Sequence, residues 1–360
     1  MMGDATSSVN SSRSTSPDAH IANDSWYCGS VFDIGGSLLK DTMREELNKK
    51  FLLTKSNGSK QRTIPASILH DEHGLRMWAE INRMPDYYQT RDEIALLEQN
   101  SKDLARHLKG AYTLIDLGCG DVRKVQPLLD TLDAMQVPVQ YFALDLSKAV
   151  LVDCMRKLRP RYRHVQCFGL WGTFDDCLKW AKNVHSPKCY MSLGSMFGND
   201  HFKEAVGRLK AWTDIMRPQD LMLLGLDGTQ DRDAIWRSYH DEQGLFHNFI
   251  RNGMVHSNAV LGHEWFKPQD WDISGEFQDF PLMHRFVIQA RRDVRCEPLG
   301  LSFRRGYKIV CYEGFKYEPA MMQKQFAAAG LKNLKQWKSP SGRIYQYLAC
   351  RASLAAETLQ

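Results

Sequence analysis

Five short apolar segments at regular intervals constrain the fold of this chain more than any other feature. Each has the length of a buried strand, and each of the first four is followed by a stretch long enough for a helix. Strands separated in this way form a parallel sheet with helices on both faces. The segments are residues 112–117, 141–145, 164–168, 189–193 and 221–226. The sequence therefore predicts an α/β core.

The regular pattern stops after the fifth segment and returns near the end of the chain. Residues 228–306 are rich in aromatic side chains and lack strand–helix spacing, which indicates an inserted second unit. A helix over 319–329 and a hairpin over 332–337 and 344–350 then close the core. Upstream, the capping-box spacing of Thr90 and Glu93 predicts a helix from Thr90 to about Lys109.

These patterns divide the chain into three expected parts. The first is a disordered or loosely ordered extension, the second a substrate-binding subdomain and the third a cofactor-binding core. Their expected bounds are 1–60 for the extension, 61–100 with 228–318 for the subdomain, and 101–227 with 319–352 for the core.

Composition argues against several classes of protein. The net charge of +5 is too small for the dense basic surface of a nucleic-acid binder. The chain has no apolar run near the roughly 20 residues of a membrane helix, and its N-terminus lacks the apolar centre of a signal peptide. Its nine cysteines include no C-x-x-C pair, which argues against a zinc cluster. We expect a cytoplasmic protein without nucleic-acid, membrane or metal partners, and the oligomeric state stays open.

Two glycines directly follow the first predicted strand, in the run Leu117-Gly118-Cys119-Gly120. A tight turn at this place lets the backbone approach a ligand at the carboxyl edge of the sheet. A dinucleotide site would have a third glycine where this chain has Arg123. The chain also lacks the G-x-x-x-x-G-K-[ST] loop of ATP sites. The glycine pair therefore argues against NAD, FAD and ATP.

An acidic residue, Asp145, ends the next predicted strand one crossover after Gly118. Its carboxylate could accept hydrogen bonds from both hydroxyls of a ribose, which together with the glycine pair fits S-adenosylmethionine (SAM). Lys124, near the start of the intervening helix, could hold the methionine carboxylate of SAM. The alternative is a glycine turn and an aspartate cap in an unrelated α/β protein, with Lys124 as a surface charge.

Seven segments, in order between about residues 64 and 351, together resemble one family. It is the amino-acid N-methyltransferases, which include the histidine-betaine enzyme of ergothioneine biosynthesis and the dimethylallyltryptophan N-methyltransferases. The segments are 84–91 (MPDYYQTR), 118–120 with Lys124, 141–147 (YFALDLS), 172–176 (GTFDD), 193–199 (LGSMFGN), 238–241 (SYHD) and 315–317 (FKY). The GTFDD run with Trp180 after it is most similar to the tryptophan-derivative branch.

The resemblance implies a class I SAM methyltransferase fold, Rossmann-like, with an inserted substrate-binding subdomain. It adds four positions to the expected cofactor site of Gly118, Gly120, Lys124 and Asp145. These are Gly172, Thr173, Phe174 and Gly194.

The same resemblance implies a substrate site. In the family, two tyrosines and an asparagine hold the α-carboxylate and amine of the substrate, and these fall on Tyr87, Asn199 and Tyr239. A tyrosine that faces the amine in the histidine enzymes aligns with His70. The acid and serine that bind the histidine ring align with Tyr312 and Gly314. Histidine is therefore not the expected substrate, and a larger or aromatic side chain is.

The expected reaction is an in-line displacement in which a neutral amine attacks the methyl group of SAM. An α-amine has a pKa of about 8, so His70 could accept its proton while Tyr87 and Tyr239 position it. The alternatives are structural roles for all three side chains. At the level of the protein, the alternatives are a small-molecule O-methyltransferase, a methyltransferase of protein or nucleic acid, and a non-catalytic SAM-binding protein.

Overall fold

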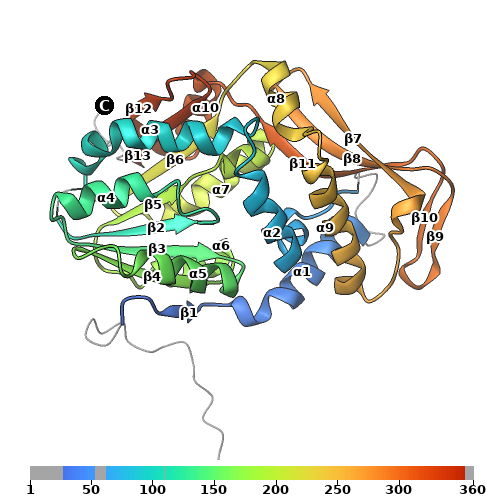
Figure 1. Cartoon of the computed structure of the whole chain (residues 1–360), viewed down its shortest axis with the longest axis horizontal. Helices are drawn as coiled ribbons and strands as arrows, with labels where there is room; N and C mark the ends of the chain where they lie inside the picture. Colours follow the sequence, from blue (N-terminus) through green and yellow to red (C-terminus); the bar gives the residue numbers. More distant parts are fainter. Residues whose placement is uncertain (1–26, 53–61, 109, 353–360) are drawn as a thin grey trace, which may run out of the picture.

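The computed structural model describes residues 27–52, 62–108 and 110–352. At its centre lies an eight-stranded sheet of order β1-β4-β3-β2-β5-β6-β13-β12 (Figure 1). Its first six strands in this order are parallel, and β13 runs antiparallel to both β6 and β12. The bounds are β1 Val31–Asp33, β2 Tyr112–Leu117, β3 Val139–Asp145, β4 Val165–Trp171, β5 Lys188–Ser192, β6 Leu221–Asp227, β12 Leu331–Lys338 and β13 Ile344–Arg351. The predicted α/β core and its closing hairpin are confirmed.

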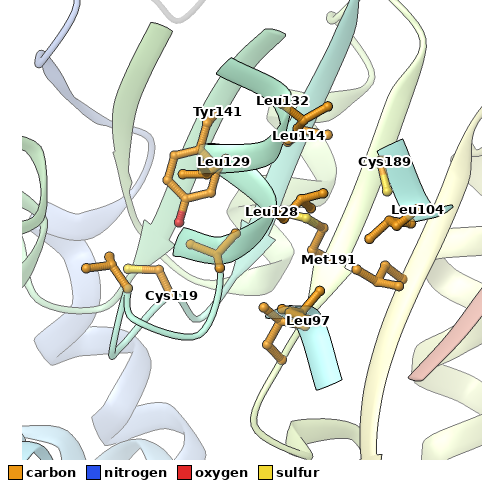
Figure 2. Packing of buried hydrophobic residues seen from close by; sticks show 14 of the residues in the cluster. Leu97, Leu104, Leu114, Cys119, Leu128, Leu129, Leu132, Tyr141, Cys189 and Met191 are labelled. Carbon is orange, nitrogen blue, oxygen red and sulfur yellow. The ribbon is translucent and has the colours of Figure 1, made fainter. Parts of the chain in front are cut away.

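Helices cover both faces of this sheet because successive strand residues point to opposite sides. Leu114 packs in the layer of α3, α4 and α5, whereas its neighbour Ile115 packs in the layer of α6, α7 and α10. Figure 2 shows leucines of α4 among strand side chains in the first layer. The bounds are α3 Tyr88–Ala105, α4 Gln126–Ala134, α5 Lys148–Leu158, α6 Phe174–Ala181, α7 Phe202–Ile215 and α10 Pro319–Ala328. None of the described helices is both long and apolar enough to cross a bilayer.

The order of the strands reverses at β2, which lies between β3 and β5. Ligands of open α/β sheets bind outside the carboxyl ends of the strands at such a reversal. Gly118 follows β2 directly, Asp145 is the last residue of β3, and Gly194 comes shortly after β5. Three of the predicted cofactor residues therefore meet at one edge of the sheet.

A second unit is built from segments before α3 and after β6, and it lies beside the large sheet, at the right of Figure 1. It contains an antiparallel sheet of order β11-β8-β7 and a small pair, β10-β9. Its buried side chains form a hydrophobic cluster of their own. The bounds are α2 Glu72–Ile81, α8 Arg232–Tyr239, α9 Leu245–Leu261, β7 Trp271–Gln278, β8 Met283–Ala290, β9 Val294–Cys296, β10 Leu301–Phe303 and β11 Lys308–Phe315. The expected insertion is therefore present.

The first part of the chain differs from the expectation of a loosely ordered extension. Residues 27–52 include β1, which pairs in parallel with β4, and α1 (Leu39–Leu47). Met43, Leu47 and Phe51 recur every four residues and are buried in the cluster of the second unit. The expectation does not hold for these residues, because this spacing supplies an apolar helix face. Residues 1–26 lie outside the described ranges.

The predicted capping box at Thr90 does not form. Helix α3 begins at Tyr88, so Thr90 lies inside it and donates its hydroxyl hydrogen to Asn82 at 2.5 Å. Glu93 instead accepts the backbone N–H of Gly194 at 2.7 Å. The helix packs in the core layer, so residues 88–100 lie on the large sheet rather than in the second unit.

Candidate functional site

The glycine turn after β2 brings the backbone close to the neighbouring strand. Gly118 and Gly120 have φ angles of 73° and 45°, a region that strains residues with a side chain. Between them, the N–H of Cys119 donates to the carbonyl of Leu144 on β3 at 2.9 Å. A Cβ atom on Gly118 would lie 2.6 Å from the sulfur of Met196. The turn therefore requires glycine, as the sequence predicted.

Asp145 faces this turn from the end of β3. One carboxylate oxygen accepts the N–H of Gly120 at 3.2 Å, and the other accepts the N–H of Ser147 at 2.9 Å. Burial raises the pKa of Asp145, and these two hydrogen bonds oppose that shift. Each carboxylate oxygen has further acceptor capacity. The arrangement suits a ligand with paired hydroxyls.

Lys124 is a buried cation without a close counter-ion. Its side chain belongs to a residue only 7% exposed, and no carboxylate of the described residues lies within 4.0 Å of its ammonium. A Cβ atom on Gly194, which has a φ of 83°, would lie 2.6 Å from Nζ. Burying an unpaired charge is costly, so this place fits an anionic group. The methionine carboxylate of SAM is such a group.

Glu93 also belongs to this region, although the sequence pattern predicted that it would cap a helix. It lies behind Gly194, and burial raises its pKa to about 7 although the charge of Lys124 lowers it. The local T-x-x-E pattern looks the same whether the glutamate caps its own helix or reaches a distant loop. The contact with Gly194 spans 101 residues of sequence, so no local signal could have shown it.

The run Gly172-Thr173-Phe174 lies between β4 and α6. Thr173 caps α6, because its hydroxyl accepts the N–H of Asp176 at 3.2 Å while Asp176 accepts the N–H of Thr173 at 3.0 Å. A Cβ atom on Gly172 would meet Ile34 at 2.8 Å. The ring of Phe174 does reach the glycine turn, within 3.9 Å of where a Cβ on Gly118 would be. Contacts of these three residues with a cofactor stay a prediction.

The five predicted substrate residues come together around one narrow cavity. They are Tyr87, Asn199, Tyr239, Tyr312 and Gly314. Tyr87 precedes α3, Asn199 ends a short helix after β5, Tyr239 ends α8, and the other two lie on β11. The space is about 10 Å³, roughly that of one water molecule. A ligand larger than water could therefore enter this space only if side chains moved.

The phenols of Tyr87 and Tyr312 are neutral hydrogen-bonding groups. Burial raises the pKa of Tyr87 well above its ordinary value, and the neighbouring Tyr312 and Tyr239 raise it further. Burial also raises the pKa of Tyr312, against a hydrogen bond from Asn199. The roles of these residues stay predictions, but a carboxylate or an amine would meet several neutral polar partners here.

His70 lines a different cavity from the five predicted substrate residues, and its role toward the amine stays a prediction. It lines a cavity of about 500 Å³ that also contacts Leu146 and Ser147, which directly follow Asp145. Its Nδ1 is 2.9 Å from the carbonyl oxygen of Ala66. Its ring contacts that of Trp78, which in turn contacts Tyr87, with ring centroids 6.2 and 5.7 Å apart. His70 is not part of the lining of the narrow cavity, and its ring is linked to Tyr87 through that of Trp78.

The narrow cavity also has polar residues to which the sequence analysis gave no role. Lys316 and Gln89 line it, and Asp227 at the end of β6 contacts both. All three side chains are nine-tenths or more buried. Lys316 lies between two aromatic residues in the FKY segment. A charged residue among buried aromatic neighbours was the signal in the sequence that could have indicated a functional role for it.

Comparison with known proteins identifies the family. Residues 43–351 match the family described as "Histidine-specific methyltransferase, SAM-dependent". The chain belongs to this family. The histidine-specific methyltransferase family uses SAM, so the expected cofactor and the methyltransferase activity are confirmed for this chain.

Three similar proteins have different names. The chain is 33% identical over 299 residues to "Ergothioneine biosynthesis protein 1" of Neurospora crassa, covering 81% of this chain and 34% of that protein. It therefore spans about a third of that relative. It is 28% identical to "N-methyltransferase imqF" of Aspergillus flavus, covering 79% of this chain and 80% of that protein. It is 27% identical to "4-dimethylallyltryptophan N-methyltransferase easF" of Claviceps purpurea, covering 85% and 94%.

Proposed function

We propose that this methyltransferase transfers the methyl group of SAM to the amine of an amino acid or of a small molecule derived from one. The observation that carries the proposal is the narrow cavity of Tyr87, Asn199 and Tyr239 beside the cofactor edge. Gly194 lines this cavity and also lies against the ammonium of Lys124. A substrate in the cavity would therefore be next to a cofactor held at Lys124. The names of two relatives include N-methylation, which favours an amine as acceptor.

The side chains of the cavity bind and orient the substrate. Tyr87, Asn199 and Tyr239 hold its α-carboxylate and amine, and each hydrogen bond to a charged group contributes about 1.5–3 kcal/mol. Such orientation would place the amine nitrogen next to the methyl group of a bound cofactor, which lowers the entropic cost of the reaction. Bound SAM supplies a methyl group that is already activated by its sulfonium sulfur. The protein therefore acts mainly by positioning and by exclusion of water.

The cofactor residues act at the edge of the large sheet. Asp145 would accept hydrogen bonds from the ribose, and Lys124 would hold the methionine carboxylate. The backbone at Gly118 and Gly120 would let the ligand approach. The large sheet with its helices is the cofactor-binding unit. The second unit, with α8 and β11, contributes most of the substrate residues.

His70 belongs to the cofactor side in this proposal, rather than to the amine. Its cavity adjoins the loop after Asp145, and the charge of Asp145 acts on it. Burial lowers the pKa of His70, so its ring is neutral near pH 7. Because His70 does not line the narrow cavity, an amine bound there would give its proton to solvent rather than to this ring.

The lining of the cavity supports a substrate other than histidine. Tyr312 and Gly314 replace the acid and serine of the histidine enzymes, and no carboxylate lines the cavity among the described residues. Glu313, next to them in sequence, instead pairs with His201 at 3.1 Å. The ring of Tyr312 is part of the lining, which favours an aromatic substrate side chain.

One incubation tests this function. The purified protein is mixed with methyl-labelled SAM and a pool that contains histidine, tryptophan, prenylated tryptophans, the matching decarboxylated amines and the matching hydroxy acids. We expect label on the nitrogen of an aromatic amino acid. Label on a hydroxy acid would instead identify an O-methyltransferase. Binding of S-adenosylhomocysteine without transfer to any member would identify a non-catalytic protein.

A further inference from the structure

The hydroxyl of Tyr239 already receives two hydrogen bonds from the protein. Nζ of Lys316 lies 3.1 Å from it, and Nε2 of Gln89 lies 3.2 Å from it. Both are donors, and a hydroxyl oxygen has two lone pairs. Both acceptor positions are therefore filled, and the hydroxyl hydrogen has to point elsewhere.

The two donors are themselves fixed by Asp227. Its Oδ2 lies 2.7 Å from Nζ of Lys316 and 3.0 Å from Nε2 of Gln89. The hydroxyl of Tyr88 donates to the same oxygen at 2.6 Å. Because a carboxylate only accepts, the amide of Gln89 must present its NH₂ group here. One hydrogen of that group meets Asp227 and the other meets Tyr239.

The ring of Tyr239 is held as firmly as its oxygen. His284 stacks on it with a centroid distance of 4.5 Å and an interplanar angle of 10°. Gly314 leaves the space for the hydroxyl, since a Cβ atom there would lie 2.7 Å from the oxygen. The remaining direction for the hydroxyl hydrogen is the narrow cavity that Tyr239 lines.

We infer that Lys316 and Gln89 are positioning residues that make Tyr239 a one-way hydrogen-bond donor toward the substrate. The inference rests on the proposed function and deepens it. The substrate atom opposite Tyr239 must then be an acceptor, which a carboxylate oxygen is and an ammonium group is not. Tyr239 therefore binds the carboxylate of the substrate, and the amine binds at the other side of the cavity. There, the hydroxyl of Tyr87 has no hydrogen bond to any other described residue.

A double-mutant cycle tests the inference. The pool experiment first supplies the best amine acceptor for the unmodified protein, and kcat and KM are then measured with that acceptor. Tyr239→Phe should lower kcat/KM by about 10–150-fold, the value of one hydrogen bond to a charged group. Lys316→Met and Gln89→Leu should each lower it several-fold. In the Tyr239→Phe background, either change should have almost no further effect.

A matched control separates positioning from general damage. Lys188 and Asp220, at the amino end of β5, form a second buried ion pair at 3.1 Å, with both side chains at most 1% exposed. Lys188→Met should lower stability as Lys316→Met does, yet leave kcat/KM and the affinity for S-adenosylhomocysteine unchanged. If Lys316→Met does not fold, Lys316→Met with Asp227→Asn removes both charges of the pair, and Gln89→Leu removes none.

The outcomes are distinct. Non-additive losses through Tyr239 support the inference. Equal losses from Lys316→Met and Gln89→Leu with and without the Tyr239 hydroxyl would overturn it, because these residues would then act directly or on the fold. A protein that binds S-adenosylhomocysteine but methylates no member of the pool overturns the proposed function, and the inference with it.

Discussion

Replacing Lys124 with methionine tests the cofactor site most directly. The ammonium is buried, and the nearby acids Glu93 and Asp116 feel its charge without lying within 4.0 Å of it. Its strongest partner should therefore be the methionine carboxylate of SAM. A charge-assisted hydrogen bond of this kind contributes about 1.5–3 kcal/mol. Lys124→Met should thus weaken binding of S-adenosylhomocysteine by about 10–150-fold.

The assay is isothermal calorimetry with two ligands. S-adenosylhomocysteine carries the carboxylate, whereas methylthioadenosine has the same nucleoside without the amino-acid part. The variant should lose affinity only for the first ligand. Lys179→Met, at an exposed lysine of α6, serves as the control for loss of a surface charge. Equal loss for both ligands, or none for S-adenosylhomocysteine, would refute the assignment of Lys124.

Three further predictions follow from the geometry. Asp145→Asn should weaken the binding of both nucleoside ligands about 10-fold or more, because its amide replaces one acceptor oxygen. Unchanged affinity in calorimetry would contradict a ribose contact. Gly314→Ser should lower kcat/KM without changing the affinity for S-adenosylhomocysteine, because its Cβ would lie 2.7 Å from the hydroxyl of Tyr239. A fully active variant would show that this hydroxyl is free to move. Glu93 binds protons more tightly in the folded state, with a pKa of about 7 against an ordinary 4.5. The free energy of unfolding should therefore fall as pH rises from 4.5 to 7, by up to about 3 kcal/mol. Glu93→Gln should reduce that fall in urea titrations at pH 5 and pH 8, and an identical fall would place the proton elsewhere.

Local sequence patterns were sufficient for the core. The apolar runs marked β2 through β6 because buried parallel strands need such runs. Gly118 and Asp145 could be placed at one edge because the ends of adjacent parallel strands meet there. Both conclusions depend only on residues close together in the sequence.

Contacts between segments that are distant in the sequence could not be predicted from such local patterns. Gln89 and Tyr239 are separated by 150 residues yet share a hydrogen bond, and only resemblance to a family had placed Tyr239 near Tyr87. Glu93 was misassigned because its partner, Gly194, is also remote, 101 residues away in the sequence. The role of His70 was transferred from an aligned position. It lies outside the lining of the narrow cavity, so that role stays a prediction.

The short strand β1 has a practical consequence for anyone who trims this protein. The family match begins at residue 43, after β1 and in the middle of α1. A recombinant version cut at that residue would uncover the outer edge of β4, and unprotected strand edges promote aggregation. It would also remove Lys40 from the wall of the cavity beside Asp145. Expression of the segment that begins at residue 43 should therefore give an aggregation-prone protein. A start upstream of residue 27 is the safer boundary.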